Sequence, residues 1–169
     1  MAQGNANGDA LHLMDTEPKT ARKWVLIVED NPLDMKLFSA LLLAEDYEVL
    51  EATNGSEGVD LAREHRPDLI IMDIRLPDIS GLEATRILKA DDKTRAIPVL
   101  ATSAYGQYAN KKQIRESGCD GYIPTPIDTG AFVRFVQSFV VAAALDPAAR
   151  ATTFLPVLSG AVTEVHEDT

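Results

Sequence analysis

The feature that most constrains the fold is a fivefold alternation of short apolar segments with amphipathic segments between residues 24 and 145. The strand segments read KWVLIV, YEVLEA, DLIIMD, IPVLATSA and GYIP, and the glutamates of YEVLEA fit a strand at the edge of the sheet. Short runs rich in Val, Ile and Leu are typical of parallel strands that are buried on both faces. We therefore predict an α/β fold in which five parallel strands and five helices form a doubly wound sheet with right-handed crossovers.

The segments between the strands carry the signals of helices. Asn31 can cap the first helix with Pro32 at its first position, and Ser80 with Glu83 can form a capping box for the third. A weaker pattern predicts a helix over residues 107–117. Two helices carry apolar residues at helical spacing, a stripe that ordinarily faces the core: Leu33, Leu37, Leu41 and Ala44 in the first, and Phe132, Phe135, Val136, Phe139 and Val140 in the last.

The flanking segments differ in composition from the central domain, which we place at residues 23–145. Residues 1–22 are polar and aperiodic, which is typical of a flexible arm. Residues 146–169 are broken by Ala and Pro around one apolar run, FLPVL. We expect this C-terminal extension to be disordered or to dock, either on the domain or on a second copy, which leaves a homodimer open.

The charge and composition exclude several classes of function. The net charge is −10 at pH 7, and residues 24–145 alone hold 12 basic and 19 acidic residues, so nucleic acid phosphates would be repelled. No apolar run is long enough to span a bilayer, and the N-terminus lacks the features of a secretory signal. The single cysteine, Cys119, excludes an internal disulfide. We expect a cytoplasmic protein with no nucleic acid and no membrane among its partners.

Polar residues follow the predicted strands at their carboxyl ends, where open α/β sheets place their active crevice. Glu29 and Asp30 follow the first strand, Asp73 ends the third, Ser103 lies at the end of the fourth, and Thr125 ends the fifth. A single Asp at a strand end is more often a helix cap or a turn former than a catalytic group. Three carboxylates that meet at one edge are harder to explain in that way.

Three adjacent carboxylates repel one another unless a cation is present. Mg²⁺ prefers oxygen ligands and commonly binds one or two carboxylates together with phosphate oxygens. A carboxylate in such a site can attack phosphorus, because the cation neutralises the charge on the transferring group. The sequence therefore predicts Mg²⁺-dependent phosphoryl transfer onto an aspartate.

At this point the sequence strongly resembles the receiver domains of two-component response regulators. The resemblance is carried, in order and spacing, by VLIVEDNPLDMKLF, PDLIIMDIRLPDISGLE, IPVLATSA and GCDGYIPTPID, and it covers about 120 residues. It is similar above all to the stand-alone receivers of bacterial cell-cycle control. The resemblance implies a flavodoxin-like sheet of order 2-1-3-4-5 and a non-enzymatic signalling role, apart from self-catalysed gain and loss of the phosphoryl group.

The resemblance also implies a role for each matching residue. Asp73 matches the phosphoacceptor of the family. The residues that match the Mg²⁺ ligands are Asp30, Asp73, Glu29 and, through its backbone carbonyl, Arg75. Ser103 and Tyr122 match the residues that switch when the phosphoryl group is present. The implied donor is a histidine kinase or a histidine phosphotransferase. The implied output surface, which contacts a downstream protein, lies within residues 107–140.

One position departs from the family pattern. The family ordinarily has a lysine before the proline that here is Pro126, commonly with a cis peptide bond between them, and this chain has Thr125. Threonine keeps a hydrogen-bond donor but removes a full positive charge from the site. We therefore expect atypical switching, with slower transfer or an altered phosphoryl lifetime.

Three alternative functions belong to other classes of protein. A receiver-like binding module that never uses phosphate is favoured by Thr125, whereas the retained acidic residues and Ser103 argue against it. An aspartate-nucleophile phosphohydrolase would need a second Asp at position 75, which is arginine. A flavodoxin-like FMN carrier would need hydroxyl and amide groups after the first strand, where the acidic sequence EDNPLD would repel phosphate.

Overall fold

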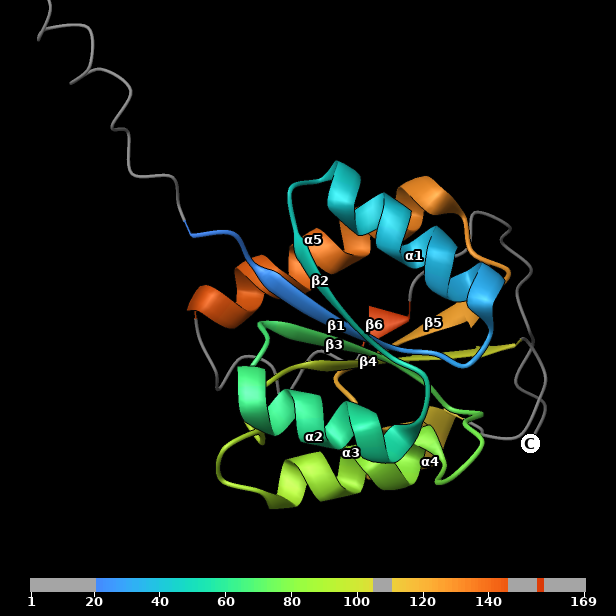
Figure 1. Cartoon of the computed structure of the whole chain (residues 1–169), viewed down its shortest axis with the longest axis vertical. Helices are drawn as coiled ribbons and strands as arrows, with labels where there is room; N and C mark the ends of the chain where they lie inside the picture. Colours follow the sequence, from blue (N-terminus) through green and yellow to red (C-terminus); the bar gives the residue numbers. More distant parts are fainter. Residues whose placement is uncertain (1–20, 105–110, 146–154, 157–169) are drawn as a thin grey trace, which may run out of the picture.

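The structure, a computed structural model, describes residues 21–104, 111–145 and 155–156. Strands and helices alternate along the chain (Figure 1): β1 Trp24–Val28, α1 Pro32–Ala44, β2 Glu48–Ala52, α2 Gly55–His65, β3 Leu69–Asp73, α3 Gly81–Ala90, β4 Val99–Ala104, α4 Lys111–Glu116, β5 Gly121–Thr125, α5 Thr129–Leu145 and β6 Leu155–Pro156. The predicted arm over residues 1–22 lies almost entirely outside the described residues, as do residues 107–110 of the predicted fourth helix.

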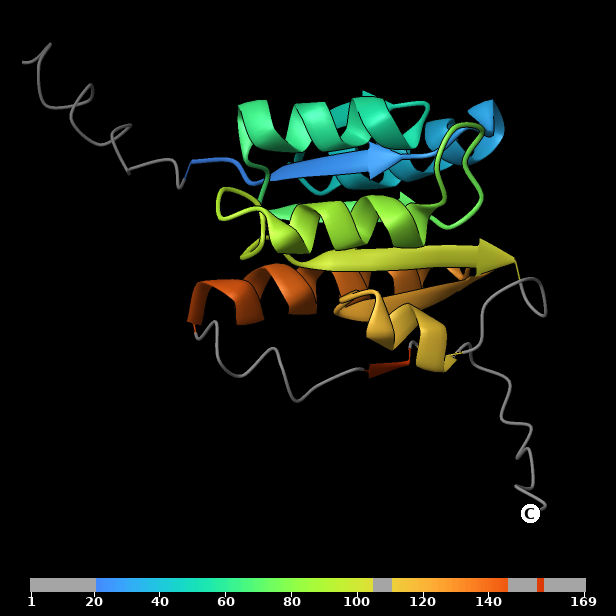
Figure 2. The same cartoon turned by 90° about the horizontal axis from the view of Figure 1, so that it is seen from below.

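All strands of the sheet are parallel, in the order β2-β1-β3-β4-β5-β6. The order 2-1-3-4-5 that the resemblance implied is thus confirmed, and the two-residue β6 adds one strand beyond β5. Figures 1 and 2 show α1 and α5 on one face of the sheet and α2, α3 and α4 on the other. This arrangement is the doubly wound architecture that the alternation predicted.

Each face of the sheet has its own apolar core. One core lies under α1 and α5, where the rings of Phe38 and Phe132 stack with centroids 5.2 Å apart. The other lies under α2 and α3 and includes Leu26, Met72 and Leu88. Because β1, β3 and β4 contribute side chains to both cores, these strands are apolar along their length, as the sequence indicated.

The helix signals in the sequence act as expected at the starts of α1 and α3. The side chain of Asn31 accepts a hydrogen bond from the Leu33 N–H at 2.9 Å, and Ser80 accepts one from the Glu83 N–H at 3.1 Å. Asp128 caps α5 by accepting the Ala131 N–H at 2.7 Å. These caps fix where each helix begins, and therefore how each strand end meets the next helix.

The orientation of α1 differs from the expectation. The residues of α1 that face the sheet are Met35, Phe38, Ser39 and Leu42. Leu33 is 76% exposed and Leu37 is 41% exposed, so the stripe that begins at Leu33 faces mostly outward. The helix has apolar residues on both sides, and Phe38 takes the buried position because its ring stacks on α5. The stripe of α5, by contrast, packs inward as predicted.

Candidate functional site

The parallel register brings the carboxyl ends of the central strands to one edge of the sheet. Val28 at the end of β1 pairs with Met72 of β3, and Asp73 pairs with Thr102 of β4. On the far side, β4 pairs with β5 up to Thr125. The residues that follow β1 therefore lie beside the ends of β3, β4 and β5 although they are far apart in the sequence.

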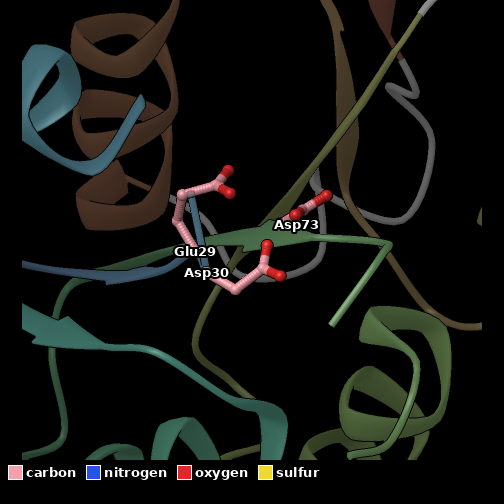
Figure 3. Close-up of side chains that lie close together, drawn as sticks. All are labelled: Glu29, Asp30 and Asp73. Carbon is pink, nitrogen blue, oxygen red and sulfur yellow. The ribbon is translucent and has the colours of Figure 1, made fainter. Parts of the chain in front are cut away.

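An acidic cluster occupies this edge, as Figure 3 shows. Carboxylate oxygens of Glu29, Asp30 and Asp73 all lie within 4.8 Å of one another. Glu29 is buried, with 5% of its surface exposed, whereas Asp73 is half-buried and Asp30 is exposed. The cluster thus extends from the interior of the crevice to solvent.

Backbone donors hold two of these carboxylates in place. The Asn31 N–H donates to Glu29 Oε1 at 3.0 Å, while the Asn31 side chain caps α1. The Arg75 N–H donates to Asp73 Oδ1 at 3.1 Å. The turns after β1 and β3 therefore orient the carboxylates through main-chain groups, which do not depend on the rotamer of a neighbouring side chain.

Burial changes the acidity of the cluster. Burial raises the pKa of Glu29 to about 8; the Asn31 N–H opposes this, and the negative charge of Asp73 adds to it. Burial also raises the pKa of Asp73, where the Arg75 N–H opposes the rise and the charge of Asp30 adds to it. In the metal-free site, Glu29 and Asp73 therefore hold protons at pH values where ordinary carboxyl groups have lost them.

The cluster lies in a pocket of about 270 Å³. The described residues that line the pocket come from the carboxyl ends of β1, β3, β4 and β5 and from the start of α1: Glu29, Asp30, Asn31, Asp34, Asp73, Arg75, Thr102, Ser103 and Thr125. Asp34 is the residue that sequence reasoning missed; its position four residues after Asp30, in the first turn of α1, was the available signal. Among the described residues of this lining, Arg75 is the one basic side chain.

The structure brings most of the predicted site residues together. Ser103 and Thr125 line the pocket beside the acidic cluster, and the peptide bond from Thr125 to Pro126 is cis. Tyr122 does not line the pocket; its half-buried side chain packs against the core under α2 and α3. The implied roles of these residues, including the backbone carbonyl of Arg75 as a metal ligand, remain predictions.

Further contacts brace the loop that follows Asp73. Asp78 accepts the N–H groups of Gly55 and Ser56, both at 2.8 Å, and so ties this loop to the start of α2. These hydrogen bonds, above all those with Ser56, lower the pKa of Asp78. A Cβ atom at Gly81 would lie 2.0 Å from the carbonyl oxygen of Asp73, so only glycine permits the start of α3 to approach the strand end this closely.

The residues of the cluster fit Mg²⁺. All three offer carboxylate oxygens, the ligand type that this ion prefers, and their separation allows one ion to contact more than one of them. A bound cation would also offset the mutual repulsion of these neighbouring carboxylates. Glu29, Asp30 and Asp73 are therefore the residues that would hold the ion.

Comparison with known proteins agrees with this arrangement. Residues 25–137 match the family model of the response regulator receiver domain. The chain is 51% identical over 118 residues to the polar-differentiation response regulator DivK of Brucella anthropi, an alignment that covers 70% of this chain and 96% of that protein.

Solved structures with the same fold include two that are informative about the site. The receiver domain of the sensor histidine kinase PA1611 from Pseudomonas aeruginosa, solved with a magnesium ion in its active-site cleft, is 30% identical with a TM-score of 0.67, covering 72% of this chain and 99% of that one. The receiver domain of Ssk1 from Saccharomyces cerevisiae was crystallised with the histidine phosphotransfer protein Ypd1. The matching chain of that structure is 27% identical to this one, with a TM-score of 0.67, and the match covers 73% of this chain and 92% of that one.

No helix in the described part of the chain combines the length and the apolar character that a bilayer crossing requires.

Proposed function

The chain belongs to the response regulator receiver family of two-component signalling, and we propose that it is a single-domain response regulator that accepts a phosphoryl group on Asp73. The observation that carries the proposal is the meeting of Glu29, Asp30 and Asp73 within 4.8 Å. These carboxylates share one pocket with Ser103. Receiver domains of this family are signalling modules rather than enzymes with a separate substrate.

The proposed chemistry follows from the placement of the side chains. An oxygen of the Asp73 carboxylate attacks phosphorus, and the new P–O bond forms as the P–N bond to the donor's histidine breaks. When bound by Glu29, Asp30 and Asp73, Mg²⁺ supplies positive charge that offsets the carboxylates and the phosphoryl oxygens. Ser103 lines the same pocket and is the hydroxyl available to donate a hydrogen bond to a phosphoryl oxygen.

The threonine on β5 makes this site atypical. Thr125 lines the pocket, but its hydroxyl cannot provide the charge of the family's lysine, and a charge-assisted hydrogen bond is about twice as strong as a neutral one. We infer slower phosphoryl transfer and weaker coupling between the phosphoryl group and the surface of β5. Tyr122 on the same strand is the aromatic residue through which that coupling would pass.

Two surfaces are suited to partners. The outward face of α1, with the exposed Leu33 and Leu37, begins beside Asp34 at the rim of the pocket. A histidine kinase or phosphotransferase that docks there would place its phosphohistidine over the crevice. The output surface, for a downstream protein, is assigned to the described part of residues 107–140 on α4, β5 and α5.

A second function, a binding module that does not use phosphate, is favoured by one observation. Thr125 lines the pocket at the position where the family ordinarily has a lysine, so the charge that anchors the phosphoryl group elsewhere in the family is missing from its usual place. In that case the fold would present its surfaces in a single state, and the acidic cluster would have no role in signalling.

The deciding experiment is the intact mass of the full chain after incubation with Mg²⁺ and acetyl phosphate. We expect the mass of one phosphoryl group to be gained by the native chain and not by Asp73→Asn, because the asparagine amide is not a nucleophile. Thr125→Lys should gain it faster. An adduct in Thr125→Lys but none in the native chain would favour the binding module, and an adduct in Asp73→Asn would place the acceptor elsewhere.

A further inference from the structure

The outer edge of β5 is covered by a segment of the C-terminal extension. β5 pairs with β4 on one side, and on the other side Gly121 pairs with Leu155 and Tyr122 pairs with Pro156, which form the short parallel strand β6 (Figure 2). We propose that residues 155–156, which we call the strap, are a displaceable cover of a strand-addition site on the edge of β5.

The edge of β5 has a physical need for a cover. Without the strap, β5 would be the last strand of the sheet and would present unpaired N–H and C=O groups to solvent. Such an edge accepts an extended peptide through main-chain hydrogen bonds, and flanking side chains then select its sequence. The side chains beside this edge of β5 are apolar: a Cβ atom at Gly121 would lie 2.9 Å from Phe139 Cζ and 3.3 Å from Phe135 Cζ. The site therefore suits an extended apolar segment.

The pairing is too short to be permanent. The strap pairs with two residues of β5, whereas β4 pairs with five. Pro156 has no N–H, so Leu155 supplies the only backbone donor of the strap, and Pro124 ends the run of donors on β5. A strand held by so few hydrogen bonds dissociates readily.

The connection to α5 explains why so weak a pairing still forms. Nine residues, 146–154, join the end of α5 to the strap. This covalent connection makes the pairing intramolecular, which favours it over the binding of a free segment. The strap is therefore bound because it is tethered, and a free peptide of the same sequence would bind weakly in competition with it.

The position of the strap gives it a consequence for signalling. It covers Gly121 and Tyr122, and the same strand ends at Thr125 in the acidic pocket. The strap thus lies on the proposed output surface, and a partner that adds a strand to β5 must first displace it. This last step rests on the proposed function, whereas the strap and its edge do not.

Leu155→Pro in the full chain tests the proposal, because it removes the only backbone donor of the strap. Thr163→Pro is the matched control, since it places the same substitution in the extension outside β6. We expect hydrogen exchange at the Tyr122 amide, which faces the strap, to be about tenfold faster in Leu155→Pro than in the native chain or the control, while the amides of Gly121 and Ile123, which face β4, should change less. Equal exchange rates in all three proteins would overturn the proposal.

Binding in trans supplies an independent readout. A labelled peptide with the sequence of residues 152–159 should bind Leu155→Pro at least about tenfold more tightly than the native chain, because no internal segment competes. Failure of the peptide to bind either protein would overturn the strand-addition site. If light scattering shows that the native chain is a dimer and Leu155→Pro is a monomer, the strap pairs with β5 of a second copy, and the proposal of a pairing within one chain is overturned. These measurements need no phosphate, so their outcome is separate from that of the proposed phosphoryl transfer.

Discussion

Replacement of Glu29 by glutamine should stabilise the metal-free protein at pH 8, although it removes a charged group from the candidate site. Glu29 is 5% exposed, and burial raises its pKa to about 8. Glutamine has nearly the same shape and can still accept the Asn31 N–H that Glu29 Oε1 accepts at 3.0 Å. The substitution therefore removes the cost of a buried negative charge while keeping the local hydrogen bond.

The size and sign of the effect follow from the pKa. Each pKa unit corresponds to about 1.4 kcal/mol, so a rise from 4.5 to about 8 amounts to at most about 5 kcal/mol. Because the folded-state pKa of this acid lies above the unfolded one, the folded state binds the proton more tightly. The resulting stabilisation is complete below the unfolded pKa of 4.5, declines as pH rises toward the folded pKa of about 8, and is lost above it.

The assay is urea unfolding of the full chain with a chelator present, at about pH 5 and about pH 8. The native protein should lose stability between these values, and Glu29→Gln should lose clearly less. Asp60→Asn, on the exposed side of α2, removes one negative charge away from the site and is the matched control. A Glu29→Gln stability within about 1 kcal/mol of the native protein at pH 8, with the same pH dependence, would refute the reasoning.

Magnesium provides the complementary test. Binding must displace the Glu29 proton below pH 8, so the apparent Mg²⁺ affinity of the native chain should rise up to about tenfold for each pH unit between about 6 and 8. Glu29→Gln should bind Mg²⁺ more weakly and with a flatter pH profile in calorimetric titration. An affinity for Mg²⁺ that is independent of pH in the native chain would contradict the assignment.

Two further substitutions probe the framework of the site. Gly81→Ala should lower the free energy of unfolding by more than about 1 kcal/mol and slow the phosphorylation of Asp73, because a Cβ atom would lie 2.0 Å from the Asp73 carbonyl oxygen. Thermal unfolding measures the first effect and intact mass the second. Native values in both would contradict the close approach. Phe38→Ala should lower the free energy of unfolding in urea by about 3–5 kcal/mol, because it removes the buried ring that stacks on Phe132. Leu33→Ala, at a position that is 76% exposed, should change it by no more than about 0.5 kcal/mol. Equal losses in the two variants would show that the orientation of α1 is wrong.

The candidate site could be anticipated from the sequence because a parallel sheet brings strand ends together in a regular way. Glu29, Asp30 and Asp73 each follow an apolar run, so their meeting required only that the runs be neighbouring parallel strands. Asp34 was missed because it belongs to a helix, where spacing alone does not show whether a side chain turns toward the crevice or away from it. The contacts of Asp78 with α2 join segments 22 and 23 residues apart and leave no local signal.

What the sequence determined by itself is the order of strands and helices, the start of each capped helix and the set of acidic residues at the strand ends, because these depend on local periodicity, capping and chain direction. The tertiary structure alone decided which face of α1 is buried, since both faces are apolar: Met35, Phe38 and Leu42 pack into the core, where Phe38 stacks on Phe132. It also decided that Leu155–Pro156 pairs with β5, because a two-residue strand carries no periodicity of its own and forms only against the open edge of another strand.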